Sequence, residues 1–478
     1  MTSSPVPPPG CPAHVGTAAT AVAPTGPGGV RRLYGPEAEA DPAGLYEKLR
    51  AEHGEVAPVL LHGDLPAWLV LGYAANLIAM RTPSRFSRDS RRWTEFQEGR
   101  VAPDSPVLPV IAWQPVCSFV DGAEQRRLRT AVTDGLNRFD RRGMRRHVTR
   151  FADQLIAEFA PAGQAELVSR FAEHLPMLVM TQLLGMPDEY GPRLVEAARD
   201  LVNGTATAVA SNEYVVECLR RTMERKRRSP GSDLVTWLME PASGLTEDEA
   251  LQHLRSVLLA ANQTTITLIS DTLKMVLTDE GFRAHLSGGQ MTLPDAIDQV
   301  LWDAPPFQLV PGRWATGDTE LGGRQIRRGD MLVLGLAAAN NDPAVRPDLS
   351  EQLYGNRSHL SFGTGPHECP GQDIGRAIAD TGIDILLTRL PDLRLAVDED
   401  ELVWKSNWMS RHLQALPVRF TPRTLAPPPP SAPDLSEADF APAPEMPFAA
   451  PPFAAASAVV PAPRRGSWWR ALLDRLWP

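Results

Sequence analysis

The sequence predicts a mainly helical α+β fold with small β-sheets, and three features of the 478-residue chain support this. Alternating apolar and polar residues at 59–61 and 67–71 predict two strands near the start of the fold. Helical patterns dominate from there to Leu301, and short strands follow in the last part of the chain. The predicted order is a small sheet, many helices and a second small sheet.

The first elements have clear boundaries. Asp41 and Pro42 form a typical helix start, and apolar residues follow one turn apart. Gly63 and Asp64 suit the turn of the hairpin that joins the two early strands. The later strands are expected at residues 319–321, 325–326, 331–334, 393–397 and 416–420.

Composition divides the chain into four parts. Residues 1–30 are rich in Pro, Gly, Ala and Thr and are predicted to be disordered. Residues 31–424 have the patterns of one folded domain, and residues 425–463 are mostly Pro and Ala, which predicts an extended linker. Residues 464–478 differ again, because they carry tryptophans and arginines.

The segment 464–478 predicts an amphipathic helix with arginines at its flanks. Its apolar stripe consists of Trp469, Leu472, Leu473 and Leu476, with Ser467 as the cap. Such a helix docks into a protein groove or lies on a membrane surface. We favour the protein groove, because one short helix is a weak membrane anchor. The alternative is a tail that folds back on its own domain or stays disordered.

Composition also excludes several classes of function. A net charge of −9 argues against nucleic-acid binding, which usually requires a basic domain. The N-terminus lacks the pattern of a signal peptide and no segment is apolar enough to span a bilayer, so we expect a cytoplasmic protein, with peripheral membrane contact through the tail as the alternative. The four cysteines, Cys11, Cys117, Cys218 and Cys369, lack the regular spacing of a disulfide framework or a zinc site.

Only Cys369 has an informative context. It lies in a loop with Gly363 and Gly365, which permit a tight turn around a sulfur atom with backbone N–H groups aimed at it. A helical pattern begins at Gly371, so a helix dipole favours the thiolate. These are the requirements of a thiolate ligand to haem iron, and Phe362 would shield the sulfur from water. The alternative is a buried cysteine beside a chance Gly-rich turn.

Residues 362–371 match the pattern FGxGxHxCxG completely and so resemble the signature of the cytochrome P450 family. The resemblance runs from about residue 41 to about residue 422. It implies the cytochrome P450 fold for residues 31–424, with haem b (iron protoporphyrin IX) as cofactor and Cys369 as the iron ligand. Phe362, Gly363, His367 and Gly371 belong to the same haem-binding loop.

The resemblance also implies residues that hold the haem propionates. Arg129 matches the arginine of an HxxxR helix motif, in which Gln125 replaces the histidine. Arg313 matches an arginine on the strand that leads away from the substrate region, and His359 and His367 complete the set. Gln125 can donate a hydrogen bond but carries no charge, so we expect a weaker propionate contact there.

Residues 260–265 resemble the family's distal helix motif, in which an acid and a threonine lie over the iron. Thr264 is retained, and Gln263 replaces the acid. A glutamine can organise water but cannot ionise. The two residues are therefore expected to arrange distal water without supplying protons to it. The alternative is an amphipathic helix with a polar turn.

The family's ExxR motif is absent. Gln299 stands where glutamate is expected, Trp302 where arginine is expected, and Glu351 is the nearest equivalent of the network's third member. Joint replacement of a buried ion network can be nearly neutral, whereas losing one member costs about 3–5 kcal/mol. We therefore expect a different packing solution, and the chain resembles the actinobacterial subgroup that lacks ExxR.

The resulting hypothesis is a haem-thiolate monooxygenase that inserts one oxygen atom of O2 into a small organic substrate, with electrons from NAD(P)H through a reductase and a ferredoxin. Substrate contacts are expected in residues 93–113, 202–214 and 305–310. A positive patch that could dock an acidic ferredoxin consists of Arg126, Arg127, Arg129, Arg141, Arg142, Arg145 and Arg146, and the alternative is that these arginines lie on solvated helix faces. The alternatives are a haem protein with little turnover that acts as a sensor or in a signalling complex, and a haem-thiolate enzyme that uses peroxide.

Overall fold

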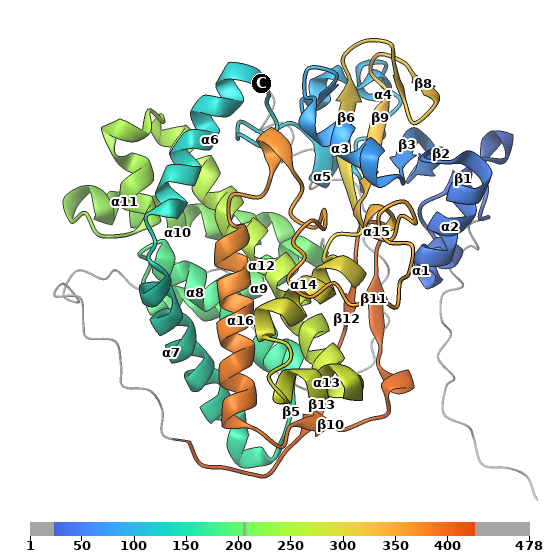
Figure 1. The fold of residues 1–478 in the computed structure, drawn as a ribbon. Coiled ribbons are helices and arrows are strands. Elements are labelled where there is room, and N and C mark those ends of the chain that lie inside the picture. Colours follow the sequence, from blue (N-terminus) through green and yellow to red (C-terminus); the bar gives the residue numbers. More distant parts are fainter. Residues whose placement is uncertain (1–22, 204–206, 426–478) are drawn as a thin grey trace, which may run out of the picture.

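The computed structural model describes residues 23–203 and 207–425 (Figure 1). The predicted linker, apart from Leu425, and the predicted C-terminal helix lie outside these residues, as does most of the predicted N-terminal segment. Within that segment, Pro27–Gly29 form a short 3-10 turn, and the chain then enters the first strand. The predicted boundaries at residues 30 and 424 remain predictions.

Sixteen α-helices are assigned within the described residues. They are α1 (Pro36–Ala40), α2 (Pro42–His53), α3 (Tyr73–Arg81), α4 (Thr94–Gln97), α5 (Leu108–Ile111), α6 (Gly122–Asn137), α7 (Arg141–Phe159), α8 (Leu175–Leu183), α9 (Gly191–Asn203), α10 (Ala208–Arg228), α11 (Leu234–Met239), α12 (Glu247–Thr278), α13 (Glu280–Ser287), α14 (Leu293–Asp303), α15 (Leu336–Asn340) and α16 (Gln372–Arg389). The mainly helical fold class is confirmed.

The strands form four small sheets in the described part of the chain. The strands are β1 (Arg31–Arg32), β2 (Val56–Leu61), β3 (Leu65–Val70), β4 (Phe86–Ser87), β5 (Gln164–Glu166), β6 (Leu309–Ala315), β7 (Thr319–Leu321), β8 (Arg324–Ile326), β9 (Met331–Gly335), β10 (Arg394–Leu395), β11 (Trp404–Ser406), β12 (Arg411–Leu413) and β13 (Pro417–Arg419). The largest sheet has the order β1-β2-β3-β9-β6-β4, and β10-β13-β5, β11-β12 and β7-β8 form the others.

The predicted start of the fold is confirmed. The Asp41 side chain accepts a hydrogen bond from the Gly44 N–H and so caps α2, while β2 and β3 pair antiparallel across the predicted hairpin turn. Asp64 in that turn has a φ of 55°, a left-handed value that Asp tolerates better than most residues. The hairpin contributes two of the six strands of the largest sheet.

Strand β6 has no predicted bounds, although Arg313 was expected on a strand. Pro311 and Gly312 interrupt the alternation of the sequence, and the pairing of β6 with β9 shifts register between Pro311 and Arg313. Gly312 has a φ of 94°, and a Cβ there would lie 2.9 Å from an Arg88 nitrogen. The irregular strand therefore brings Arg313 and Arg88 into one neighbourhood.

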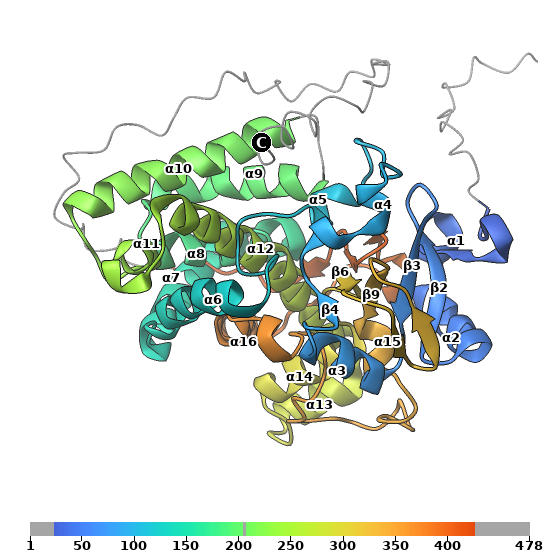
Figure 2. The same cartoon turned by 90° about the horizontal axis from the view of Figure 1, so that it is seen from above.

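Helix α12 runs through the centre of the helical region. It has 32 residues, which makes it about 48 Å long, and Thr246 and Glu249 form a capping box at its start. Its buried side chains belong to the large apolar core shared with α7, α8 and α16. Figure 1 shows α16 upright beside α7, with the largest sheet on the opposite side of the molecule, and Figure 2 shows α9 and α10 running along one edge. Among the described residues, no helix is both long and apolar enough to cross a membrane.

Candidate functional site

The loop around Cys369 lies between a short 3-10 turn, Gly365–His367, and the start of α16. Gly363 and Gly365 have φ values of 67° and 76°, and a Cβ on Gly365 would lie 3.0 Å from the Met80 carbonyl oxygen. The Cys369 N–H donates a 2.8 Å hydrogen bond to the Phe362 carbonyl, which folds the loop back on itself. The glycines are thus needed for the conformation that the sequence predicted.

Burial has the largest influence on the Cys369 thiol and raises its pKa. The Gly371 N–H and the Arg129 guanidinium act in the opposite direction but do not cancel this effect, and the charge of Glu368 adds to it. A metal cation at the sulfur would favour the thiolate, because a coordinating thiol is deprotonated by the metal. Phe362 lies next to this loop, with the Arg376 guanidinium 5.1 Å from the centre of its ring.

Helix α6 braces the Cys369 loop from outside. Gln125 Nε2 donates to the Pro366 carbonyl at 2.7 Å, and Arg129 donates to the Glu368 carbonyl. His367 Nε2 lies 3.0 Å from Asp121 Oδ1, at the N-cap of the same helix, and burial lowers the pKa of His367 to about 4. Gln125, Arg129 and His367, which the sequence predicts to contact the propionates, are thus hydrogen-bonded to protein groups in the structure. Each still has other donors or ring atoms for a further partner.

Arg313 is a buried cation with unused hydrogen-bond donors. It is 3% exposed, and its Nε and Nη1 atoms have no hydrogen-bond partner in the structure. Burial lowers its pKa to about 9, and the nearby charge of Arg88 adds to this effect. Buried guanidinium nitrogens without acceptors are costly, so this position fits a carboxylate such as a haem propionate.

His359 offers a second open donor. Arg376 Nη2 lies 2.9 Å from His359 Nε2, and arginine can only donate, so we infer that Nε2 accepts and that Nδ1 carries the ring proton. Nδ1 is buried and has no partner. Burial also lowers the pKa of His359, although the adjacent Asp298 acts in the opposite direction. A neutral histidine with one free N–H therefore fits a propionate oxygen.

The middle of α12 borders open space. Between Arg255 and Thr264 the buried side chains are Leu258 and Asn262, and Ala260 is exposed, although the helix is buried throughout residues 265–273. The Thr264 hydroxyl donates to the Ala260 carbonyl at 3.2 Å. A helix stretch that lacks neighbours on one face is what a bound planar group and its substrate require.

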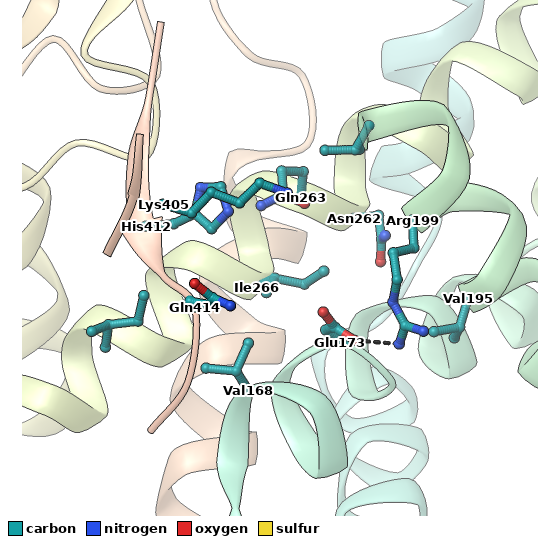
Figure 3. A pocket seen from close by; sticks show the side chains of 12 residues that line it. Val168, Glu173, Val195, Arg199, Asn262, Gln263, Ile266, Lys405, His412 and Gln414 are labelled. Carbon is teal, nitrogen blue, oxygen red and sulfur yellow. Dashed lines mark hydrogen bonds and ion pairs between the residues drawn. The ribbon is translucent and has the colours of Figure 1, made fainter. Parts of the chain in front are cut away.

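Gln263 faces a cavity of about 130 Å³ that also contacts α9, the turn Val168–Ala172 and the β11-β12 hairpin (Figure 3). Its polar lining includes Asn262, whose amide oxygen is buried without a partner, and the ion pair between Glu173 and Arg199. The volume is sufficient for several water molecules. The two predicted distal residues are thus neighbours on α12, and Gln263 has access to a polar cavity.

The position of the missing ExxR motif is filled by a different network. Gln299 accepts a 2.7 Å hydrogen bond from the Leu353 N–H and donates to Asp303 at 2.9 Å. Asp303 pairs with Arg346 at 2.6 Å, and Arg346 is 3% exposed. The Trp302 indole N–H donates to the Asn356 carbonyl at 2.8 Å. The residues at the ExxR position are therefore held by a different set of contacts, as the sequence led us to expect.

The partners in this network differ from the expectation at one point. The sequence predicts Glu351 as the nearest equivalent of the third member. In the structure, the Leu353 N–H bonds to Gln299 and Arg346 pairs with Asp303. Sequence spacing missed Arg346 because it precedes the predicted position by five residues. The signal available was an arginine beside Pro347 together with an acid, Asp303, directly after Trp302.

Comparisons with known proteins agree on one family, although no family model matches the sequence. The chain is 31% identical over 397 residues to the cytochrome P450 monooxygenase PikC of Streptomyces venezuelae, covering 81% of this chain and 92% of PikC. It is 29% identical over 400 residues to 2-hydroxy-5-methyl-1-naphthoate 7-hydroxylase of Streptomyces carzinostaticus, covering 81% and 97% of the two chains. Among solved structures, CYP154C4 from Streptomyces sp. W2061 superposes with a TM-score of 0.72 at 27% identity, covering 79% and 95%.

Proposed function

Because this chain belongs to the cytochrome P450 family, we propose that Cys369 would hold the iron of its haem b group as a thiolate ligand. The chain is a haem monooxygenase that acts on a small organic substrate. When bound, the haem supplies the redox chemistry that activates dioxygen. The observation that carries the assignment of Cys369 is its loop, in which two left-handed glycines and a backbone hydrogen bond hold the sulfur at the start of α16.

In this proposal the residues around Cys369 and the haem site have different tasks. Arg313 and His359 would hold the propionates through their unpartnered buried nitrogens. Arg129, Gln125 and His367 brace the cysteine loop and add donors at the same edge. The loop itself, through Phe362, Gly363 and Gly371, covers the sulfur and lets backbone N–H groups lie close to it.

Thr264 and Gln263 would arrange the water that takes part in the haem chemistry. The Thr264 oxygen can accept a hydrogen bond from water while its proton stays on the Ala260 carbonyl. The Gln263 amide can hold water at both its oxygen and its nitrogen, and the adjacent cavity supplies that water. Neither side chain ionises near neutral pH, so each proton must come from water or from another group.

Restoring an acid at position 263 tests this assignment. Gln263→Glu is expected to raise the ratio of oxidised product to released peroxide by about two- to tenfold, because a carboxyl group can supply protons that an amide cannot. The ratio is measured with any substrate that turns over. Gln414→Glu is the matched control, since it places an acid in the same cavity but away from α12. Equal effects of the two variants, or no effect of either, would contradict the assignment.

The family requires a redox partner, and we propose a ferredoxin that docks on an arginine patch formed by Arg126, Arg141, Arg142 and Arg146. All four side chains are exposed, and none of them forms an ion pair within the described residues. Their neighbours Arg127, Arg138 and Arg145 pair with Glu249, Glu240 and Asp384. Asp140 lies close enough to interact with the charges of Arg142 and Arg146, but it neutralises at most part of the patch. A positive patch of this kind attracts an acidic protein at low salt.

Reversing two charges of the patch is expected to slow reduction by an acidic ferredoxin. The double variant Arg142→Glu and Arg146→Glu should lower the second-order rate of haem reduction by about tenfold at low ionic strength, with a smaller effect at high salt. Arg220→Glu with Arg228→Glu makes the same change of charge on exposed residues of α10. If this control slows reduction equally, net charge and not the patch is responsible.

The four-part division of the chain and the role of residues 464–478 are also proposals. We infer that the Pro- and Ala-rich linker tethers a Trp- and Arg-rich helix, which binds a protein groove in preference to a membrane surface. We also propose that residues 93–113, 202–214 and 305–310 contribute substrate contacts. Helices α4 and α5 lie within the first range, α9 ends and α10 begins within the second, and β6 begins within the third.

A further inference from the structure

Arg255 lies on α12 at the edge of the open stretch described above, and it is half-buried. Its guanidinium reaches two other parts of the chain. Nη2 donates to Gln114 Oε1 at 2.6 Å, and Nη1 donates to Asn212 Oδ1 on α10 at 3.1 Å. Nε lies 3.3 Å from Gln252 Oε1 on the same helix. Arg255 therefore stands where α10, α12 and the loop that precedes α6 meet.

The charge of Arg255 has no counterion in the described part of the chain. All three of its hydrogen-bond partners are neutral amides, and it forms no ion pair. Burial lowers the pKa of Arg255, and no acid offsets this effect. By contrast, the buried Arg346 pairs with Asp303, and the half-buried Arg376 pairs with Asp298. A partly buried cation that is held by amides alone is costly, and an anion would stabilise it.

The guanidinium has the donors for such an anion. Arginine carries five N–H groups, and the three hydrogen bonds of Arg255 use three of them. Two N–H groups remain, and the partner amides are side chains that can rotate away. A carboxylate matches a guanidinium in charge, planarity and the spacing of its two oxygens.

We propose that Arg255 binds the carboxylate of an anionic substrate where α12, α10 and the loop before α6 meet. The inference rests on the proposed function, since it assigns a substrate class to that site. The Arg255 partner Asn212 lies within one of the three segments proposed to contact the substrate, and the partner Gln114 directly follows another. A substrate that is anchored at Arg255 therefore lies beside those segments, and the anchor orients the rest of the molecule.

Arg255 could instead be a structural strut, and the two roles make different predictions. A strut stabilises the contact between Gln114 and Asn212 whatever ligand is present. Its loss would weaken the binding of acids and of neutral molecules by the same factor. A carboxylate anchor discriminates between the two classes of ligand, so only the binding of acids depends on its charge.

The test is a ligand titration of the holoprotein, read as a spin-state shift and by calorimetry. The probes are dodecanoate with dodecan-1-ol and 2-naphthoate with 2-naphthalenemethanol, two pairs in which the acid and the alcohol have similar shapes. Wild-type protein is expected to bind at least one acid about tenfold or more tightly than its alcohol. Arg255→Gln should remove this preference, and Arg255→Lys should keep part of it because the charge remains.

Gln114→Ala is the matched control, because it removes a partner of Arg255 but not the charge. It should keep the preference for acids. Equal loss of acid and alcohol binding in Arg255→Gln, or the same result in Gln114→Ala, would overturn the proposal. The proposal would also be overturned if wild-type protein with the carbon monoxide spectrum of a haem thiolate bound neither acid more tightly than its alcohol. A wild-type protein that bound none of the four probes would count as this result. Loss of that spectrum itself would instead refute the proposed function.

Discussion

Replacing Cys369 with alanine is expected to abolish the red-shifted Soret band that a thiolate ligand produces in the reduced carbon monoxide complex. The thiolate donates electron density through the iron, and no other side chain can replace a sulfur anion in this role. The wild-type holoprotein should show the band, and the variant should lose it completely, whether or not haem remains bound. The measurement is a difference spectrum of reduced protein with and without carbon monoxide.

The controls for this experiment are within the chain. Cys218 is a fully buried thiol on α10, and burial raises its pKa to about 11, so Cys218→Ala should leave the band unchanged. An unchanged band in Cys369→Ala would refute the assignment of the ligand. Wild-type protein that stays colourless after addition of hemin would refute the haem site as a whole. A variant that binds haem without the band would locate the effect at the sulfur.

The second large effect is expected at Arg346. Arg346→Met leaves the Asp303 carboxylate with Gln299 as its remaining partner. It also removes the hydrogen bonds that Arg346 donates to the Asn341 side-chain oxygen and to the Leu349 carbonyl. Removing one member of a buried pair typically costs about 3–5 kcal/mol, and the partial exposure of Asp303 reduces this to about 2–4 kcal/mol. The free energy of unfolding is measured by urea denaturation of the holoprotein, followed by circular dichroism and haem absorbance.

A double variant separates charge from packing in this network. Arg346→Met with Asp303→Asn removes both charges, so most of the lost stability should return relative to Arg346→Met alone. Gln299 keeps a hydrogen-bond partner in the double variant, because an asparagine oxygen also accepts. If the single and double variants are equally unstable, then Arg346 acts by its volume, and the ion pair does not replace the missing ExxR motif.

The start of the fold and the cysteine loop could be predicted because their signals are local. Asp41 caps α2 within three residues, and Gly363 and Gly365 act on the turn that contains them. Strand β6 could not be bounded, because the irregularity at Pro311 and Gly312 hides its alternation. Strand β6 pairs with β9 on one side and with β4 on the other, and these two partners are far apart from each other in the sequence.

The candidate site shows the same division. The sequence proposed Arg313 and His359 as propionate contacts from motif positions, and the structure adds that both have buried nitrogens without partners. It also shows that Gln125, Arg129 and His367 are bonded to the cysteine loop or to Asp121, which motif positions do not reveal. Arg255 was not singled out from the sequence, since an arginine on an amphipathic helix is ordinarily solvated.

The sequence by itself determined the fold class, the cysteine loop and the family resemblance, because these depend on periodicity and on residues that are close together in the chain. Only the tertiary structure decided which charges are neutralised. Arg346 finds Asp303 across 43 residues, whereas Arg255 meets only amides from segments up to 141 residues away. Counterions are chosen by packing between distant segments, so an arginine's partner, or its lack of one, is a property of the folded chain.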